Sequence, residues 1–186
     1  MREFFERRRV LLIAPVAFAG LVAVTSKRGV AEHTEGGSVD LMTFDEQGAA
    51  TGVQTLPTVV KSAAEWKAML SAQQYYVTRQ ASTDTPFTGT YYELHAAGMF
   101  RCVCCGTALF RSQEKFDSGT GWPSFWAPAD KRNVRERTDV SMLMERVEVG
   151  CRRCEAHLGH VFPDGPAPTH LRYCINESSL RFVKNA

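Results

Sequence analysis

The cysteines of this chain fall into two CxxC pairs and two single residues. Cys102 and Cys105 form the first pair, and Cys151 and Cys154 form the second. Two thiolates separated by two residues can bind one metal ion from a single tight turn, and two such turns complete a tetrahedral four-thiolate zinc site. A site of this kind leaves no position open for water, so we expect one structural Zn²⁺ per chain.

Two other uses of the CxxC pairs are open at this level. Exported proteins favour disulfides, and a CxxC pair can also act as a redox dithiol of the thioredoxin type. The redox motif normally opens a helix in a βαβ unit, and the sequence shows no such alternation. We therefore favour zinc, with Cys104 as an inert buried thiol or an auxiliary ligand.

A second group of residues could carry out a reaction. Cys174 stands apart from both pairs in the segment RYCIN (172–176), and an unpaired cysteine in a polar, aromatic-flanked segment is a candidate nucleophile. His157 and His160 would ordinarily suggest metal ligands, but four cysteines already fill the metal shell. The two imidazoles are therefore candidate general acid–base groups. Trp122, between Gly121 and Pro123, would by itself more often be a core residue than a substrate wall.

Several short segments resemble, in order, the methionine-R-sulfoxide reductase B family. They are CVCC (102–105), GTGWPSF (119–125), CRRC (151–154), HLGHVF (157–162) and RYCIN (172–176), and the resemblance covers roughly residues 57–183. It implies a mainly β (α+β) fold of two antiparallel sheets with short N-terminal helices and a zinc site far from the active site. The implied function is reduction of methionine-R-sulfoxide in proteins through a cysteine sulfenic acid, regenerated by a thioredoxin-like or other thiol reductant.

The resemblance also implies a role for individual residues. Cys174 would be the nucleophile, His157 and His160 would deliver or position a proton for the sulfoxide oxygen, and Asn176 would hydrogen-bond within the site. The side chains that it places against the substrate are Trp122, Phe162 and Arg172.

The chain departs from the family pattern near the nucleophile. Some family members have a resolving cysteine where this chain has Thr120, and a threonine cannot form the disulfide that regenerates the enzyme. Either an external thiol reduces the sulfenic acid, which we favour, or Cys104 resolves it. His170 and Glu177 also differ from the family's usual residues, and they could either tune the pKa of Cys174 or face solvent.

The N-terminus has the composition of a targeting segment. Arg7, Arg8 and Arg9 precede a 15-residue apolar run, residues 10–24. This length suits the apolar core of a secretory signal and is short of the roughly 20 residues of a membrane-spanning helix. We expect residues 1–28 to be a signal peptide or a membrane anchor with a tether through residues 10–26. The protein would then be exported or anchored on the periplasmic side of the cell envelope.

The rest of the chain divides into a linker and a domain. Residues 29–56 are rich in Gly, Ser, Thr and acids and predict a flexible linker, which leaves residues 57–186 as the catalytic domain. A capping box at Ser62 predicts a helix over about 63–71, with another turn near 72–79. Beyond residue 98, apolar runs punctuated by Gly and Pro predict short antiparallel strands.

Charge limits the possible partners. Residues 29–186 contain 16 basic and 18 acidic residues, so this part of the chain has no field that attracts nucleic acid. We expect a monomer whose partners are oxidised proteins and a thiol reductant. The alternative hypothesis, a non-catalytic zinc-stabilised binding module, explains the CxxC pairs but leaves Cys174 and the histidines without a role.

Overall fold

The computed structural model describes residues 36–140 and 145–185. The predicted signal peptide or anchor (1–28), with its tether at residues 10–26, lies outside the described residues. Within the described part of the chain, no helix is long and apolar enough to cross a membrane.

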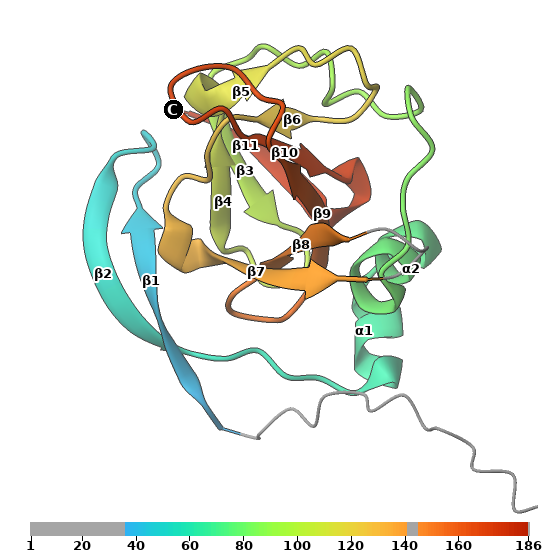
Figure 1. Ribbon diagram of the computed structural model, residues 1–186. Helices are drawn as coiled ribbons and strands as arrows, with labels where there is room; N and C mark the ends of the chain where they lie inside the picture. The colour runs from blue at the N-terminus through green and yellow to red at the C-terminus, as the bar shows by residue number, and fades with distance from the viewer. Residues whose placement is uncertain (1–35, 141–144, 186) are drawn as a thin grey trace, which may run out of the picture. The chain divides into compact units, whose positions relative to one another are not determined.

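Antiparallel strands form three sheets in the described residues (Figure 1). The largest sheet has the strand order β5-β6-β10-β9-β8-β7. Its strands are β5 (Lys115–Phe116), β6 (Ser124–Phe125), β7 (Val134–Asp139), β8 (Arg146–Cys151), β9 (His157–Phe162) and β10 (Arg172–Ile175). The second sheet has the order β11-β3-β4, with β3 (Gly98–Cys102), β4 (Ala108–Arg111) and β11 (Leu180–Lys184). The predicted mainly β fold with antiparallel sheets is confirmed.

The third sheet occupies residues for which the sequence predicts a flexible linker. β1 (Ser38–Phe44) pairs antiparallel with β2 (Ala50–Pro57). The linker prediction is therefore wrong over these two strands. The composition of this segment suggests a linker because a strand is usually recognised by alternating apolar and polar residues, and little such alternation is present. The structure shows why: Leu41 is the one fully buried side chain of the described hairpin.

A buried amide attaches this hairpin to the rest of the domain. Asn133 is fully buried, and its Oδ1 accepts a hydrogen bond from the N–H of Met42 at 2.9 Å. Its Nδ2 donates to the carbonyl oxygens of Met42 (2.9 Å) and Ala108 (2.8 Å). One side chain thus satisfies backbone groups from β1 and β4, which are far apart in the sequence.

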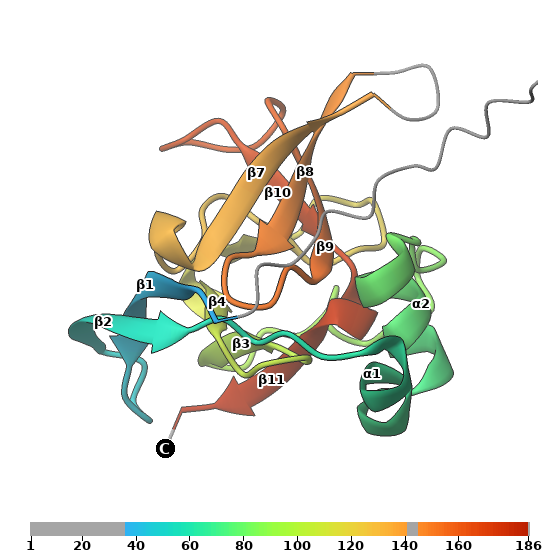
Figure 2. The same cartoon turned by 90° about the horizontal axis from the view of Figure 1, so that it is seen from below.

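Two short helices precede the larger sheets, as the sequence predicts. They are α1 (Ala63–Met69) and α2 (Ala72–Gln80), and each begins with a complete capping box, Ser62 with Glu65 and Ser71 with Gln74. α1 ends before the predicted residue 71 because Leu70 is extended and Ser71 already caps α2. Figures 1 and 2 show these helices and the β1–β2 hairpin at opposite ends of the larger sheets. Short 3₁₀ turns lie at Ser112–Glu114, Lys131–Asn133 and Glu177–Ser179.

An aromatic cluster forms the core between the two larger sheets. Phe110 of β4 stacks on Phe125 of β6 with ring centroids 4.5 Å apart, and Phe100 of β3 contacts Phe125 at 5.0 Å. Tyr173 of β10 lies 5.8 Å from Phe110. Because side chains alternate along a strand, burying Phe125 and Tyr173 in this core turns Ser124 and Cys174 toward the other face of the sheet.

Asn133 offers a direct test of how the hairpin is held. Asn133→Ala should lower the free energy of unfolding by about 2–4 kcal/mol, since two part-buried backbone groups of Met42 and one buried carbonyl of Ala108 lose their partner. Urea denaturation of the full chain measures this. Thr55→Ala, which removes an exposed hydrogen bond to Asp40, is the control and should cost less than about 0.5 kcal/mol. Equal costs for the two variants would contradict the role of Asn133.

Candidate active site and metal centre

One transverse row of the six-stranded sheet carries polar side chains on a single face. The pairing places Cys174 of β10 between Ser124 of β6 and His160 of β9. His160 in turn pairs with Glu148 of β8, and Glu148 pairs with Arg137 of β7. Directly paired residues of antiparallel strands project to the same face. The row therefore lies on the face turned away from the aromatic core.

His157 lies on the same face as His160 although the two are three residues apart. In a regular strand such residues point to opposite faces. A register shift between Val149 and Gly150 of β8 alters this alternation, and the two imidazole centroids are 5.5 Å apart. Gly159 permits the irregularity because a Cβ at this position would collide with the carbonyl oxygen of Cys174. The structure thus brings both predicted acid–base residues together beside β10.

Burial dominates the electrostatics of Cys174. Burial raises the pKa of its thiol above the ordinary value, while the charge of Arg172 and a hydrogen bond from Thr120 act in the opposite direction. Since the net shift is upward, the thiol is the resting form at neutral pH. The thiolate forms only when a base removes the proton.

Arg172 and Phe162 form one stacked unit next to Cys174. The guanidinium lies 4.6 Å from the centroid of the Phe162 ring. It also donates two hydrogen bonds to the carboxylate of Asp164, from Nε at 2.9 Å and from Nη2 at 2.8 Å. Asp164 therefore fixes a positive charge where it can stabilise the Cys174 thiolate, and Arg172 is anchored before any substrate arrives.

Asn176 and Trp122 are connected through the backbone of Asp84. The N–H of Asp84 donates to Asn176 Oδ1 at 2.9 Å, and its carbonyl accepts from Trp122 Nε1 at 3.0 Å. Asn176 is buried, and its Nδ2 donates to the carbonyl of Leu158 at 3.0 Å. Both the oxygen and the nitrogen of the Asn176 amide are thus bonded to backbone groups. Asn176 holds Asp84 in place, and Asp84 in turn accepts the hydrogen bond of the Trp122 indole.

Trp122 borders two surface cavities. The first, of about 400 Å³, has Asp84, Thr85, Glu177 and Ser178 among its lining residues. The second, of about 260 Å³, is lined by Phe87, Tyr92 and His95 among others. The half-buried indole can therefore present an apolar face to a ligand, in contrast to the fully buried aromatics of the core.

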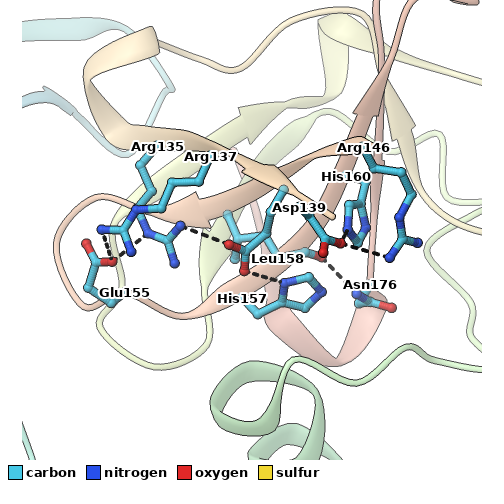
Figure 3. A network of polar contacts seen from close by, with 10 residues as sticks. Arg135, Arg137, Asp139, Arg146, Glu155, His157, Leu158, His160 and Asn176 are labelled. Atoms are coloured by element: carbon cyan, nitrogen blue, oxygen red, sulfur yellow. Dashed lines mark hydrogen bonds and ion pairs between the residues drawn. The ribbon is translucent and has the colours of Figure 1, made fainter. Parts of the chain in front are cut away.

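Two carboxylates that the sequence analysis missed contact the imidazoles. Glu148 Oε1 lies 2.8 Å from His157 Nδ1, and Asp139 Oδ2 lies 2.8 Å from His160 Nε2 (Figure 3). Burial lowers the pKa of His160, and the contact with Asp139 partly offsets this. The alternation along residues 146–149 indicates a strand, but only the register across three strands shows which imidazole each acid meets.

The two residues flanking Cys174 take different positions. Glu177 accepts hydrogen bonds from the backbone N–H groups of Thr90 and Tyr91, both at 2.7 Å. It therefore holds a loop and does not simply face solvent. His170 is exposed, with φ of +58° in the left-handed region that favours glycine. Neither residue is among the groups that shift the pKa of Cys174.

The four cysteines of the CxxC pairs converge on one point. Their Sγ atoms lie within 4.8 Å of one another, with Cys102–Cys154 at 3.6 Å and Cys105–Cys151 at 3.5 Å. Tetrahedral thiolates about 2.3 Å from a metal would be about 3.8 Å apart, whereas a disulfide needs about 2.05 Å. All six cysteines are free, and Cys104 is buried beside the pairs. The donor set thus fits a four-coordinate metal ion.

Comparisons with known proteins agree with these features. Residues 70–184 match the family model described as the SelR domain. A protein of Hahella chejuensis named peptide methionine sulfoxide reductase MsrB is 56% identical over 124 residues, which cover 67% of this chain and 89% of that protein. Proteins of the same name from Herminiimonas arsenicoxydans (56% over 124 residues; 67% and 90%) and Pseudomonas aeruginosa (52% over 118 residues; 63% and 89%) are also similar.

Removing one cysteine ligand should destabilise the domain. Cys151→Ser should lower the bound metal measured by elemental analysis and cost several kcal/mol of unfolding free energy, since a structural metal stabilises the fold that forms its site. Cys174→Ser is the control and should keep its metal. An unfolding temperature of the unsubstituted protein that stays constant on metal chelation would contradict a structural role.

The charge of Arg172 should be measurable in the titration of Cys174. Arg172→Met removes a charge that lowers the pKa of Cys174, so the pKa should rise further above its ordinary value. Alkylation of Cys174 by iodoacetamide, followed by peptide mass spectrometry over a pH series, should therefore show a midpoint at higher pH. Arg172→Lys keeps the charge and should show a smaller displacement. An unchanged midpoint in Arg172→Met would exclude this coupling.

Proposed function

The chain belongs to the peptide methionine sulfoxide reductase MsrB family, and we infer from this membership that it reduces methionine-R-sulfoxide in peptides and proteins to methionine. At the level of residues, we propose Cys174 as the nucleophile. The observation that carries this proposal is the transverse row in which Cys174 pairs with His160 on a polar face of the sheet. The alternative of a non-catalytic binding module gives no role to the row of polar side chains that the described residues place around Cys174.

The proposed reaction is a transfer of oxygen from the substrate sulfur to Cys174. The sulfur of Cys174 attacks the sulfoxide sulfur and forms a bond with it. The S–O bond of the substrate and this new S–S bond then break as the oxygen is transferred to Cys174. The thiol of Cys174 becomes a sulfenic acid, and the sulfoxide of the substrate becomes a thioether. The substrate sulfur is therefore reduced and the Cys174 sulfur is oxidised. Atoms and electrons balance without another reactant in this step.

Proton movement is the part that needs the histidines. The raised pKa of Cys174 means that its proton must leave as the sulfur attacks, and the sulfoxide oxygen must gain a proton before it can leave. We propose that His160 and His157 carry out these transfers. Burial keeps the pKa of His160 below its ordinary value, so that its neutral form can accept the thiol proton at neutral pH, and this same proton is then available to the sulfoxide oxygen.

The substrate would be held by the groups around this row. We propose that the indole of Trp122 contacts the S-methyl group of the substrate, an apolar contact that distinguishes the two epimers. The Arg172–Phe162 unit would border the site from β9 and β10, with Arg172 stabilising negative charge on Cys174. Asn176 would act through its hydrogen bonds to Leu158 and Asp84, which order the segment near Trp122.

Regeneration would depend on a thiol from outside the chain. Thr120, whose side chain acts to lower the pKa of Cys174, occupies the place in which a resolving cysteine could stand. Cys104 lies inside the first CxxC pair and is buried, so we do not assign it the role of resolving cysteine. One thiol of a thioredoxin-like dithiol would condense with the Cys174 sulfenic acid to a mixed disulfide and release water. Its second thiol would then attack this disulfide, which frees the Cys174 thiol and leaves the reductant as a disulfide.

The identity of the metal and the location of the protein are also proposals. Four thiolates with near-tetrahedral spacing support Zn²⁺. Export or membrane anchoring on the periplasmic side is supported by the three arginines before the apolar run of residues 10–24.

The nucleophile can be tested with pure epimers of a methionine sulfoxide peptide. The full chain with a dithiol reductant should reduce the R epimer and leave the S epimer unchanged. Cys174→Ser should reduce the rate to the uncatalysed background because the attacking sulfur is gone. Cys104→Ser is the matched control and should retain turnover. Full activity of Cys174→Ser would refute the assignment, and loss of activity in Cys104→Ser with its metal retained would refute the external reductant.

A further inference from the structure

His157 has a buried ring nitrogen that no described residue satisfies. Its side chain is 5% exposed, and Nδ1 lies 2.8 Å from Glu148 Oε1. Nε2 is buried and has no hydrogen-bond partner among the described residues. Buried polar atoms in native proteins nearly always have a partner, so an exception calls for a water molecule or a ligand. Nε2 is therefore the nitrogen that is available to a polar atom of a reactant.

Glu148 is itself held in place from the other side. Its Oε2 forms an ion pair with Arg135 Nη1 at 3.1 Å, and Arg135 Nε lies 2.6 Å from Glu155 Oε2 (Figure 3). The Arg135 side chain is 11% exposed, so water screens these pairs weakly. Burial raises the pKa of Glu148, but the hydrogen bond with His157 and the charge of Arg135 outweigh it and lower the pKa to about 2. Glu148 is consequently a carboxylate at neutral pH.

An ionised carboxylate can only accept hydrogen bonds. The 2.8 Å contact therefore requires that Nδ1 of His157 carry the proton and donate it to Glu148. In the neutral imidazole, Nε2 is then left with a lone pair. In the other neutral tautomer, with the proton on Nε2, the lone pair of Nδ1 would face the carboxylate oxygen of Glu148 with no proton between them. Such a contact between two acceptors is unfavourable at a buried site.

We propose that Glu148 is a positioning residue that fixes the ring and the tautomer of His157, so that Nε2 is the nitrogen that exchanges a proton with the reacting groups. The inference rests on the proposed function, because it assigns a partner to one of its acid–base residues. Arg135 supports the arrangement by keeping Glu148 ionised and oriented. Glu148 does not touch the reacting atoms in this role; it acts through His157.

The second imidazole shows that the arrangement is specific to His157. His160 uses the opposite nitrogen, Nε2, for its contact with Asp139. The two rings therefore present different nitrogens on the same face, and two carboxylates from β8 and β7 select them. A purely structural ion pair between Glu148 and His157 would not account for the unpartnered Nε2.

Glu148→Gln tests this role because the amide has the shape of the carboxylate but can either donate or accept. It should allow both tautomers of His157, which ¹⁵N NMR of the ring distinguishes after assignment with His157→Gln. We expect the kcat for the R-sulfoxide peptide to fall by about 10²-fold, toward the lower end of general acid–base contributions, while KM changes little. Circular dichroism and metal content should remain those of the unsubstituted protein.

Glu136→Gln is the matched control. Glu136 is an exposed carboxylate on the adjacent strand that accepts from Tyr173 Oη at 2.8 Å, and its loss should leave the His157 tautomer and kcat unchanged. A resting His157 with its proton on Nε2 would overturn the proposal, and this measurement needs no variant of Glu148. A kcat within twofold of normal in Glu148→Gln would also overturn it. If the unsubstituted protein reduces neither epimer, the proposed function fails instead, whatever the tautomer.

Discussion

The antiparallel pairing of β10 with β9 is the constraint on which both the core and the candidate site depend. Side chains alternate along β10, so the register that buries Tyr173 among the aromatic rings also sets Cys174 opposite His160. A slip of one residue would turn Cys174 into the core and Tyr173 out of it. The stacking of Phe110 on Phe125 stabilises the neighbouring strand in the same register. Packing of aromatic side chains on one face of the sheet therefore determines which polar side chains lie next to Cys174 on the other face.

The metal centre and the candidate active site are joined by ion pairs. Glu155 directly follows the ligand Cys154 and has a φ of +58°, in a region that glycine usually occupies. Its carboxylate pairs with Arg135 at 2.6 Å and with Arg137 at 3.0 Å. Through Arg135 this pairing continues to Glu148. The turn that carries Cys151 and Cys154 thus also orders the strands beside the imidazoles, so a metal ion held by the four cysteines would support the site without taking part in its chemistry.

The environment of Cys174 has two opposite effects on its sulfur, one that favours the unreactive thiol and one that favours the reactive thiolate. Burial favours the neutral thiol, and only a thiolate reacts readily with oxidants and alkylating agents. Arg172 and Thr120 oppose this effect by stabilising negative charge at the sulfur. A thiol of this kind is reactive mainly when a base and a suitable electrophile are both beside it. In the proposed reaction, Cys174 depends on the imidazoles because its burial keeps the proton on its sulfur.

The sequence by itself determined the features that depend on neighbours along the chain. The candidate metal ligands come as two CxxC turns, and both helices begin at local capping boxes. HLGHVF (157–162) and RYCIN (172–176) contain the candidate reactive residues. Only the tertiary structure decided which side chains meet across strands. Glu148 reaches His157 through the register of β8 and β9, and Asn133 holds a hairpin 91 residues away at Met42. The contact of Glu148 with His157 depends on strand register, which a shift of one residue would change, and the contact of Asn133 depends on burial of its amide against a hairpin distant in the sequence.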